Sequence, residues 1–237
     1  MKILIIIPAY NEEGAILNVV NELLATYDEL DYIIINDCST DRTTKIIEEN
    51  SLNRINLVCN LGVGGAVQTG YQYALANNYD IAVQFDGDGQ HDPKYLSSII
   101  DPIVKGDADV CIGSRFIEKE GFQTSFMRRV GIRFLSRIIK WVTKVNVTDV
   151  TSGFRACNKQ MIEHYSKHYA QDYPEPEAIV STSIYGFSVM EVPVVMRERL
   201  AGVSSISSFK SIYFMIKVSL AIIIYRMMVN SKHRKGE

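Results

Sequence analysis

The feature that most constrains the fold is a regular alternation of short apolar runs with longer helical patterns in the first half of the chain. The apolar runs are rich in β-branched residues, which is typical of strands, whereas the longer segments repeat apolar residues at helical spacing. Strands that alternate with helices predict an α/β domain around a largely parallel sheet. We expect strands at residues 2–7, 32–35, 56–59, 81–85 and 109–112, and helices at 15–27, from 43, at 65–76 and at 94–104.

The second half of the chain is less regular. A basic amphipathic helix is expected over residues 126–142, and a further strand over 187–196. Neither an internal repeat nor a low-complexity linker divides the sequence, so we expect one domain over residues 1–208. Residues 209–237 are then a C-terminal extension.

This extension is strongly apolar between residues 212 and 229, but Lys217 and Arg226 interrupt it. A helix that spans a bilayer needs about 20 apolar residues. We therefore expect an apolar, basic helix that lies on a membrane surface or packs against another subunit, either a second copy or a small membrane protein. A helix packed on the protein's own domain is the alternative.

Charge is unevenly distributed along the sequence. The whole chain has a net charge of −2, and from Lys210 onward six Lys or Arg residues face one Glu, about +5, which leaves about −7 for the rest. An acidic body with a basic tail favours a membrane surface as partner and argues against nucleic acid. The four cysteines contain no CxxC pair, and the first apolar run is too short for a signal peptide. Both features favour a cytosolic protein with reduced thiols.

The segment QFDGDGQHDP at residues 84–93 follows one of the expected strands. By itself an Asp-Gly-Asp run is more often a solvated turn than a site. Ligands of open α/β sheets, however, bind beyond the carboxyl ends of strands, where three other polar loops are also expected. Asp86 and Asp88 are therefore candidate ligands of a hard cation, with Gln90 as a third. Asp92, before a proline, is interpreted as a helix cap, and His91 is given no role.

Two further loops offer candidate ligand contacts. Asp37 ends a strand in NDCSTD, and its carboxylate could accept hydrogen bonds from a nucleotide base, while residues 39–41 are explained by helix capping. In NLGVGG, the spacing matches neither a dinucleotide fingerprint nor a P-loop. We interpret Gly64 and its neighbours as allowing close approach of the backbone to a ligand.

The remaining charged candidates lie in the second half of the sequence. Guanidinium groups match phosphate oxygens, which makes certain arginines candidate phosphate contacts, although a solvated surface explains any one of them. Carboxylates could orient an acceptor or act as a base, and two of them are expected in an extended segment stiffened by prolines. His164 and His168 are expected to face solvent. The arginines are Arg115, Arg128, Arg129 and Arg155, and the carboxylates are Asp149, Glu175 and Glu177.

The order of these motifs resembles glycosyltransferase family 2, and within it the polyprenyl-phosphate sugar synthases. The likeness covers about residues 3 to 208, and the ordered combination is far more specific than any one motif. Two departures are the single Asp37 where paired aspartates are usual, and a C-terminus without the paired transmembrane helices of many bacterial relatives. The motifs are IPAYNEE, NDCSTD, NLGVGGAVQTGYQYA, QFDGDGQHDP, GSR, DVTSGFRA and RERLAGVSSIS.

The resemblance implies a GT-A fold, which is a three-layer α/β arrangement, and a nucleotide-sugar donor used with Mn²⁺ or Mg²⁺. Carried over by position, it assigns Asp86, Asp88 and Gln90 to the metal loop, and Arg115 and Arg128 to the phosphates. Arg199 and Ser205 correspond to a loop that closes over the donor. The nucleotide pocket corresponds to Pro8, Tyr10, Glu12 and Asp37.

The function expected from these observations is transfer of a hexose or N-acetylhexosamine, with inversion, from a UDP- or GDP-sugar to a polyprenyl phosphate. We expect it at the cytoplasmic face of a membrane, with peripheral attachment. Asp88, Asp149, Arg115 and Arg128 are the candidate catalytic residues, and the acceptor candidates are Arg155, Glu175 and Glu177. The alternatives are transfer to a glycan hydroxyl during synthesis of a cell-surface polysaccharide, and a non-catalytic membrane subunit that binds nucleotide sugars.

Overall fold

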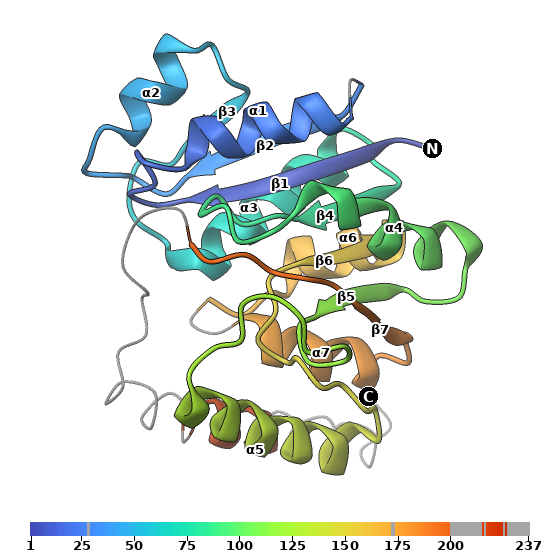
Figure 1. Cartoon of the computed structure of the whole chain (residues 1–237). Coiled ribbons are helices and arrows are strands. Elements are labelled where there is room, and N and C mark those ends of the chain that lie inside the picture. The colour runs from blue at the N-terminus through green and yellow to red at the C-terminus, as the bar shows by residue number, and fades with distance from the viewer. Residues whose placement is uncertain (28, 172–173, 200–214, 216, 225, 227–237) are drawn as a thin grey trace.

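The computed structural model describes residues 1–27, 29–171, 174–199, 215, 217–224 and 226 (Figure 1). Within these residues one sheet of seven strands has the order β3-β2-β1-β4-β6-β5-β7. Only β6 runs antiparallel to its neighbours in that sheet, so the expected mostly parallel α/β sheet is confirmed. The strands are β1 (Ile3–Ala9), β2 (Asp31–Asn36), β3 (Arg54–Asn56), β4 (Ile81–Gln84), β5 (Val110–Ser114), β6 (Arg155–Asn158) and β7 (Val189–Pro193).

Helices cover both faces of this sheet and make three layers. One face carries α1 (Ile16–Thr26), α2 (Thr43–Glu49) and α4 (Leu96–Lys105), which follows the short 3₁₀ turn η1 (Pro93–Tyr95). The other face is covered by α3 (Gly62–Ala76), α5 (Phe126–Thr143), α6 (Lys159–Lys167) and α7 (Pro174–Ile184).

The central strand β1 shows why the sequence folds this way. Leu4 and Ile6 belong to the core on the α3 side, and Ile5 and Ile7 belong to the core on the α1 side; all four are fully buried. Successive side chains of a strand point to opposite faces, so a continuous apolar run needs cover on both. The sequence pattern therefore places β1 in the middle of a sandwiched sheet.

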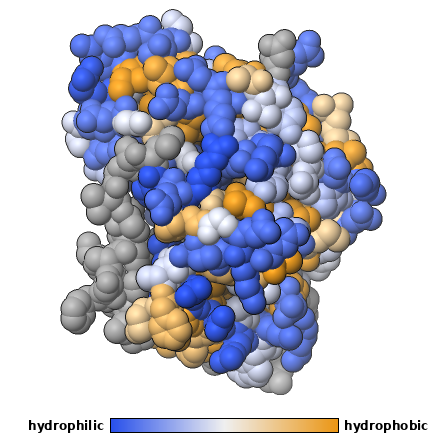
Figure 2. Space-filling model, viewed as in Figure 1, coloured by the Kyte–Doolittle hydropathy of each residue, from blue (hydrophilic) through white to orange (hydrophobic). Residues whose placement is uncertain are grey.

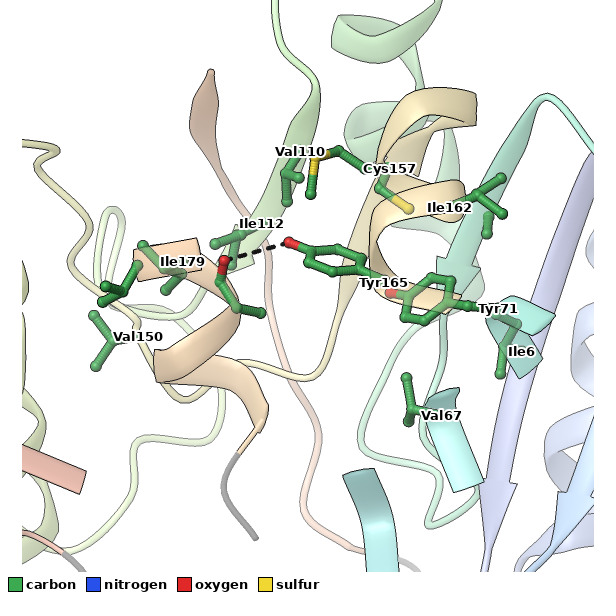
Figure 3. Close-up of a cluster of buried hydrophobic side chains, with 14 of the residues drawn as sticks. Ile6, Val67, Tyr71, Val110, Ile112, Val150, Cys157, Ile162, Tyr165 and Ile179 are labelled. Atoms are coloured by element: carbon green, nitrogen blue, oxygen red, sulfur yellow. Dashed lines mark hydrogen bonds between the residues drawn. The ribbon is translucent and has the colours of Figure 1, made fainter. Parts of the chain in front are cut away.

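Three aromatic side chains join the helices on the α3 side. The rings of Tyr71 in α3 and Tyr165 in α6 lie 5.2 Å apart between centroids, and Tyr169 packs edge-on against both. The Tyr165 hydroxyl is 2.5 Å from the Thr182 hydroxyl of α7 (Figure 3). These contacts fix α3, α6 and α7 to one another beneath the sheet.

Two strands differ from the sequence-based expectation. The third strand covers residues 54–56, not 56–59, because its register with β2 pairs Asn56 with Asn36 and the chain then turns toward α3. Strand β6 was not expected, because four residues of sequence RACN contain no β-branched side chain. Pairing with two neighbouring strands, and not local preference, makes this segment a strand.

The described part of the tail packs on the chain's own domain. Residues 217–224 are helical, and Val218 and Ile222 are fully buried in the core that also contains α5. This is the alternative that the sequence left open; most of residues 209–237 lie outside the described residues, and a contact of the tail with membrane or subunit stays a prediction. No helix of the described chain combines the length and the apolar character needed to cross a bilayer.

Gly64 gives a direct test of packing between α3 and the segment that precedes α7. A Cβ at this position would collide with the backbone of Ala170 and Gln171, which cannot move aside as a flexible side chain would. We expect Gly64→Ala to lower the free energy of unfolding by about 1–3 kcal/mol. Gly131→Ala in α5 is the matched control, because its Cβ would meet only the flexible end of Met215. Urea unfolding compares the two, and equal stability of both variants would contradict this packing.

Candidate active site

The carboxyl ends of β1, β2, β4 and β5 lie at one edge of the sheet, and the polar loops expected there follow them. The loop after β4 carries Asp86 and Asp88. Between them, Gly87 passes so close to β1 that a Cβ would lie 3.1 Å from the carbonyl oxygen of Pro8. Glycine at this position therefore allows the aspartates to meet the residues that follow β1.

His91, which had no role in the sequence analysis, shapes the aspartate loop from inside. Its buried ring stacks on Phe154 at 4.7 Å between centroids, and its Nδ1 accepts a hydrogen bond from the Asp86 backbone N–H at 3.0 Å. Because Nδ1 accepts, the ring proton is at Nε2, which faces Asp86 Oδ2 at 3.6 Å. Asp92 accepts a hydrogen bond from the Lys94 backbone N–H, so its interpretation as a cap is confirmed.

Three carboxylates gather at this edge. Glu12, from the loop after β1, is mostly buried beside Asp88, and its Oε2 has no hydrogen-bond partner among the described residues. Burial, followed by repulsion from Asp88 and Asp86, raises the pKa of Glu12 to about 7. Burial and the neighbouring Asp86 also raise the pKa of Asp88. The arrangement has excess negative charge that a cation would neutralise.

Arg199 supplies part of that positive charge. Its Nη2 lies 2.9 Å from Asp88 Oδ2, and its Nη1 lies 3.9 Å from Glu12 Oε1. The segment is held in place at Arg197, whose backbone N–H donates to the Gln90 carbonyl and whose carbonyl accepts from the Gln90 side chain. Gln90, proposed from sequence as a third metal ligand, therefore already uses its amide N–H to hold this segment. Ser205 lies outside the described residues.

Arg115 and Asp149 form a buried pair. Arg115 Nε lies 2.6 Å from Asp149 Oδ2, and Nη2 lies 2.7 Å from Oδ1, a two-pronged contact in which Asp149 is fully buried. Burial alone lowers the pKa of Arg115, but the Asp149 carboxylate raises it overall. This geometry does not support Asp149 as a base for the acceptor, because both of its oxygens bind Arg115. Its role is to hold Arg115 at the end of β5.

Arg128 and Glu175 lie on the same side of the site. Arg128, in the first turn of α5, is half-buried, and burial together with nearby Arg115 lowers its pKa. Burial raises the pKa of Glu175. The charge of Asp86 raises it further, whereas the charges of Arg155 and Arg128 oppose the rise. Glu175 is therefore near both the aspartate loop and Arg128.

The expected extended presentation of the acidic pair after β6 is wrong. Pro174 is the first residue of α7, and Glu175 and Glu177 lie in its first turn. Proline is favoured there, because its fixed φ suits a helix and the first turn needs no N–H partner. Glu177 lines a cavity of about 200 Å³ with His168 and Ile222, whereas Glu175 lies with the site residues.

Arg155 was expected to contact an acceptor or a phosphate, but it is fully buried in the chain. Its guanidinium donates to the carbonyl oxygens of Ser152 and Glu175. It positions the start of α7, and with it Glu175. The structure therefore does not support direct contact of Arg155 with a ligand.

The residues assigned to the nucleotide pocket separate into exposed and structural ones. Tyr10 is 46% exposed at the edge of the site. Asp37 is buried, and its Oδ1 accepts from the Leu61 backbone N–H at 2.7 Å, at the start of α3. Burial raises its pKa, and the bonds from Leu61 and Gly62 oppose this. The contact with Leu61 gives Asp37 a structural role just before α3, and packing against Ala170 and Gln171 gives one to Gly64. The assignment of both residues to the nucleotide pocket stays a prediction.

Two site residues were missed in the sequence. Asn11 adopts a left-handed conformation at φ 57°, and its Oδ1 accepts from the backbone N–H groups of Thr40 and Asp41, which joins the first two loops. Gly153 lies against Asp86, where a Cβ would come within 2.6 Å of Oδ2. The sequence did contain signals for both. Asn in YNEE is a residue type that tolerates the left-handed backbone conformation, and Gly in SGF is one that allows close contact with a neighbouring side chain.

A sequence model of the family Glycosyl transferase family 2 matches residues 4–166. The chain belongs to this family. It is 35% identical over 213 residues to the UDP-N-acetylglucosamine–dolichyl-phosphate N-acetylglucosaminyltransferase of Methanococcus voltae, a match that covers 81% of this chain and 84% of that protein. It is 28% identical over 231 residues to the polyprenol monophosphomannose synthase of Mycolicibacterium smegmatis, covering 92% and 86%. The protein is thus a glycosyltransferase related to polyprenyl-phosphate sugar synthases.

The fold of this glycosyltransferase is also found in solved structures. Glucosyl-3-phosphoglycerate synthase from Mycobacterium tuberculosis, in complex with Mn²⁺, UDP-glucose and phosphoglyceric acid, superposes with a TM-score of 0.71 at 17% identity. The match covers 95% of this chain and 79% of that chain. The GT-A fold expected from the sequence is confirmed by this likeness.

Breaking the buried ion pair between Arg115 and Asp149 should destabilise this glycosyltransferase. Asp149→Asn would leave the Arg115 guanidinium buried without a matching charge. We expect the free energy of unfolding to fall by about 3–5 kcal/mol. Glu163→Gln is the matched control, because its ion pair with Lys167 is exposed and should contribute less than about 1 kcal/mol. Urea unfolding measures both, and a loss for Asp149→Asn no larger than the control would contradict the assigned role.

Glu12 should make stability depend on pH. Its folded pKa of about 7 exceeds the ordinary 4.5, so the folded protein binds more protons between these values and loses stability as pH rises through them. In metal-free buffer, Glu12→Gln should therefore stabilise the protein at pH 8 by about 2 kcal/mol more than at pH 5. Urea unfolding at both pH values measures this difference, with exposed Glu29→Gln as control. The same gain in stability at both pH values would show that the pKa of Glu12 is not raised in the folded protein.

Proposed function

We propose that this glycosyltransferase is metal-dependent and inverting, and that it moves a hexose or N-acetylhexosamine from a UDP- or GDP-sugar to a polyprenyl phosphate. The observation that carries the proposal is the opposition of charges at the sheet edge. Glu12, Asp86 and Asp88 lie close together, and Arg199 forms ion pairs with Asp88 and Glu12. Arg128 lies nearby. Such an edge suits a divalent cation together with a diphosphate. The names of the relatives support nucleotide-sugar donors and polyprenyl phosphate acceptors.

The residues present fit Mn²⁺ or Mg²⁺. Hard cations bind carboxylate oxygens, and Mg²⁺ commonly takes one or two protein carboxylates with the rest of its shell from water and substrate phosphates. Asp86 and Asp88 offer that number, and within the described residues no set of three or more His, Cys, Asp or Glu side chains forms a closed metal site. A bound cation would neutralise charge on the diphosphate leaving group. Complexes of the structural neighbour with Mn²⁺ and with Mg²⁺ support this choice.

The chain's own residues would orient the donor. Arg199 already lies at Asp88, and its guanidinium fork matches two oxygens of a diphosphate. The unpartnered Oε2 of Glu12 can accept a hydrogen bond from a hydroxyl or amine of the nucleotide, and the exposed ring of Tyr10 offers a surface for a base. These contacts place the diphosphate next to the aspartate loop.

The acceptor side favours a phosphate. A phosphate oxygen is ionised near neutral pH and can form its bond to the anomeric carbon directly, while the diphosphate leaves from the opposite face and the configuration inverts. This step needs no strong base, which agrees with the commitment of both Asp149 oxygens to Arg115. Arg128, which carries no ion pair among the described residues, is the arginine we assign to the acceptor phosphate.

One observation favours the alternative acceptor, a glycan hydroxyl. Burial raises the pKa of Glu175, and it lies close enough to Asp86 to be affected by its charge, so it could act as a general base. We place the reaction at a membrane surface, with peripheral attachment, because a polyprenyl phosphate is held in the bilayer by its hydrocarbon chain. We propose the cytoplasmic face because the cysteine pattern favours reduced thiols. A lipid-free product would support the hydroxyl alternative. Donor binding without turnover would support the non-catalytic one.

The decisive assay is transfer of radiolabelled sugar from UDP- and GDP-linked donors to undecaprenyl or dolichyl phosphate, with and without Mn²⁺ or Mg²⁺. We expect a lipid-linked product that requires the cation. Asp88→Asn should lower the rate at least about 100-fold, since it removes charge where the diphosphate is held. Asp101→Asn on the exposed side of α4 is the control. Absence of lipid product with every common donor would contradict the acceptor, and full activity of Asp88→Asn would contradict the metal loop.

A further inference from the structure

Helix α5 presents an unusual outer surface for a helix that also packs on a core. Its buried side consists of Ile132, Leu135, Ile139 and Val142. On the opposite side, large apolar side chains are exposed to solvent: Phe126 is 68% exposed, Phe134 is 50% exposed and Trp141 is 70% exposed. Positions 126, 130, 134 and 141 fall on one side of a helix with 3.6 residues per turn. We call Phe126, Val130, Phe134 and Trp141 the apolar stripe.

A row of cations lies along one edge of this stripe. Arg129, Arg133 and Arg137 are four residues apart, and Lys140 extends the row by a turn. We call these four residues the basic flank. They line a cavity of about 410 Å³ together with Lys119, and no carboxylate of the described residues lines it. Within the described chain none of the four forms an ion pair with a carboxylate.

The combination points to one kind of partner. Exposed aromatic and aliphatic side chains beside Lys and Arg are characteristic of helices that lie in the headgroup region of a bilayer, where cations reach lipid phosphates and rings enter the acyl boundary. A neutral apolar partner would leave the basic flank without counter-charges. A second copy in a two-fold contact at this face would bring like charges together. An anionic bilayer satisfies both the stripe and the flank.

We propose that α5 is a docking surface for an anionic phospholipid bilayer, with the apolar stripe in the headgroup boundary and the basic flank on lipid phosphates. α5 lies at the end of the molecule away from β1 (Figure 1), and the side chains of its apolar stripe are exposed to solvent. Figure 2 shows apolar and strongly hydrophilic side chains next to each other in that region. The proposal rests on the proposed function for its purpose, because a lipid acceptor must reach Arg128 on the same helix.

Docking would also orient the enzyme. Arg128 and the basic flank belong to one helix but to different sides, since Arg128 is half-buried toward the site and Arg133 and Arg137 are exposed. A bilayer held against the flank therefore contacts the helix that carries Arg128, while Arg128 itself lies on the side of α5 that faces the site. This differs from attachment through residues 209–237, and the two can be separated by experiment.

Trp141 makes the test direct, because it is the single tryptophan of the chain. The full chain is mixed, without donor or metal, with vesicles of phosphatidylcholine alone or of phosphatidylcholine with phosphatidylglycerol. We expect a blue shift of the emission of Trp141 and quenching by brominated acyl chains only with the anionic vesicles. Unchanged emission on vesicles that nevertheless sediment with the protein would overturn the proposal and assign binding to another segment.

Substitutions separate the flank from the rest of the surface. Arg133→Gln with Arg137→Gln should weaken binding to anionic vesicles at least about tenfold. Each cation near the surface contributes roughly a fivefold gain in affinity, and the double variant removes two. Lys45→Gln with Lys159→Gln removes the same charge far from α5 and should bind as the wild type does. Phe134→Ser should weaken binding at high salt as well. Wild-type binding by the arginine double variant would overturn the proposal, as would burial of Trp141 by self-association in the absence of vesicles.

Vesicle binding and sugar transfer are measured apart, so the two proposals can fail separately. Transfer to a short-chain, water-soluble polyprenyl phosphate should be retained by the Arg133→Gln, Arg137→Gln variant, and its unfolding midpoint should match the wild type. If transfer is absent in the wild type while Trp141 still enters anionic vesicles, the proposed function fails and the docking surface stands. If transfer occurs and Trp141 does not respond, the docking surface fails.

Discussion

Repulsion among three carboxylates at one edge of a parallel sheet is the interaction on which the rest of this site depends. Glu12, Asp86 and Asp88 come from loops after two neighbouring strands, and their charges raise the pKa values of Glu12 and Asp88 beyond the effect of burial. Arg199 offsets part of this repulsion at 2.9 Å from Asp88. The edge keeps unbalanced negative charge, which supports the proposed binding of a divalent cation together with a diphosphate.

Burial decides which charged residues can take part in chemistry. Arg115 binds both carboxylate oxygens of Asp149, and Arg155 donates hydrogen bonds to two backbone carbonyl oxygens inside the chain. Buried charges need such partners, because leaving water is costly for them. Among the described residues, Glu12 keeps an unpartnered Oε2 and Arg128 forms no ion pair, so both remain available for the roles that we propose.

Sequence patterns predicted the elements with strong local signals. β1 and β4 are continuous apolar runs, and α5 repeats its apolar residues at helical spacing, so their positions agree with expectation within a few residues. β6 has no such signal and becomes a strand only through its two neighbours. The same limit applies to the site. Asp86 and Asp88 could be selected from their place after a strand, but the partner of Asp149 lies 34 residues earlier in the chain, and no local pattern shows that contact.

The sequence by itself determined the alternation of strands and helices in the first half of the chain, the family pattern, and the set of polar side chains at the strand ends, because these depend on periodicity and on residue type. Only the tertiary structure decided how each of those side chains is used. Asp37 accepts a hydrogen bond from Leu61 just before α3, His91 supports the aspartate loop, and Glu175 lies in the first turn of α7. The physical reason is that the role of a charged side chain depends on its burial and on the partners within a few ångströms, and both are set by contacts between segments distant in sequence.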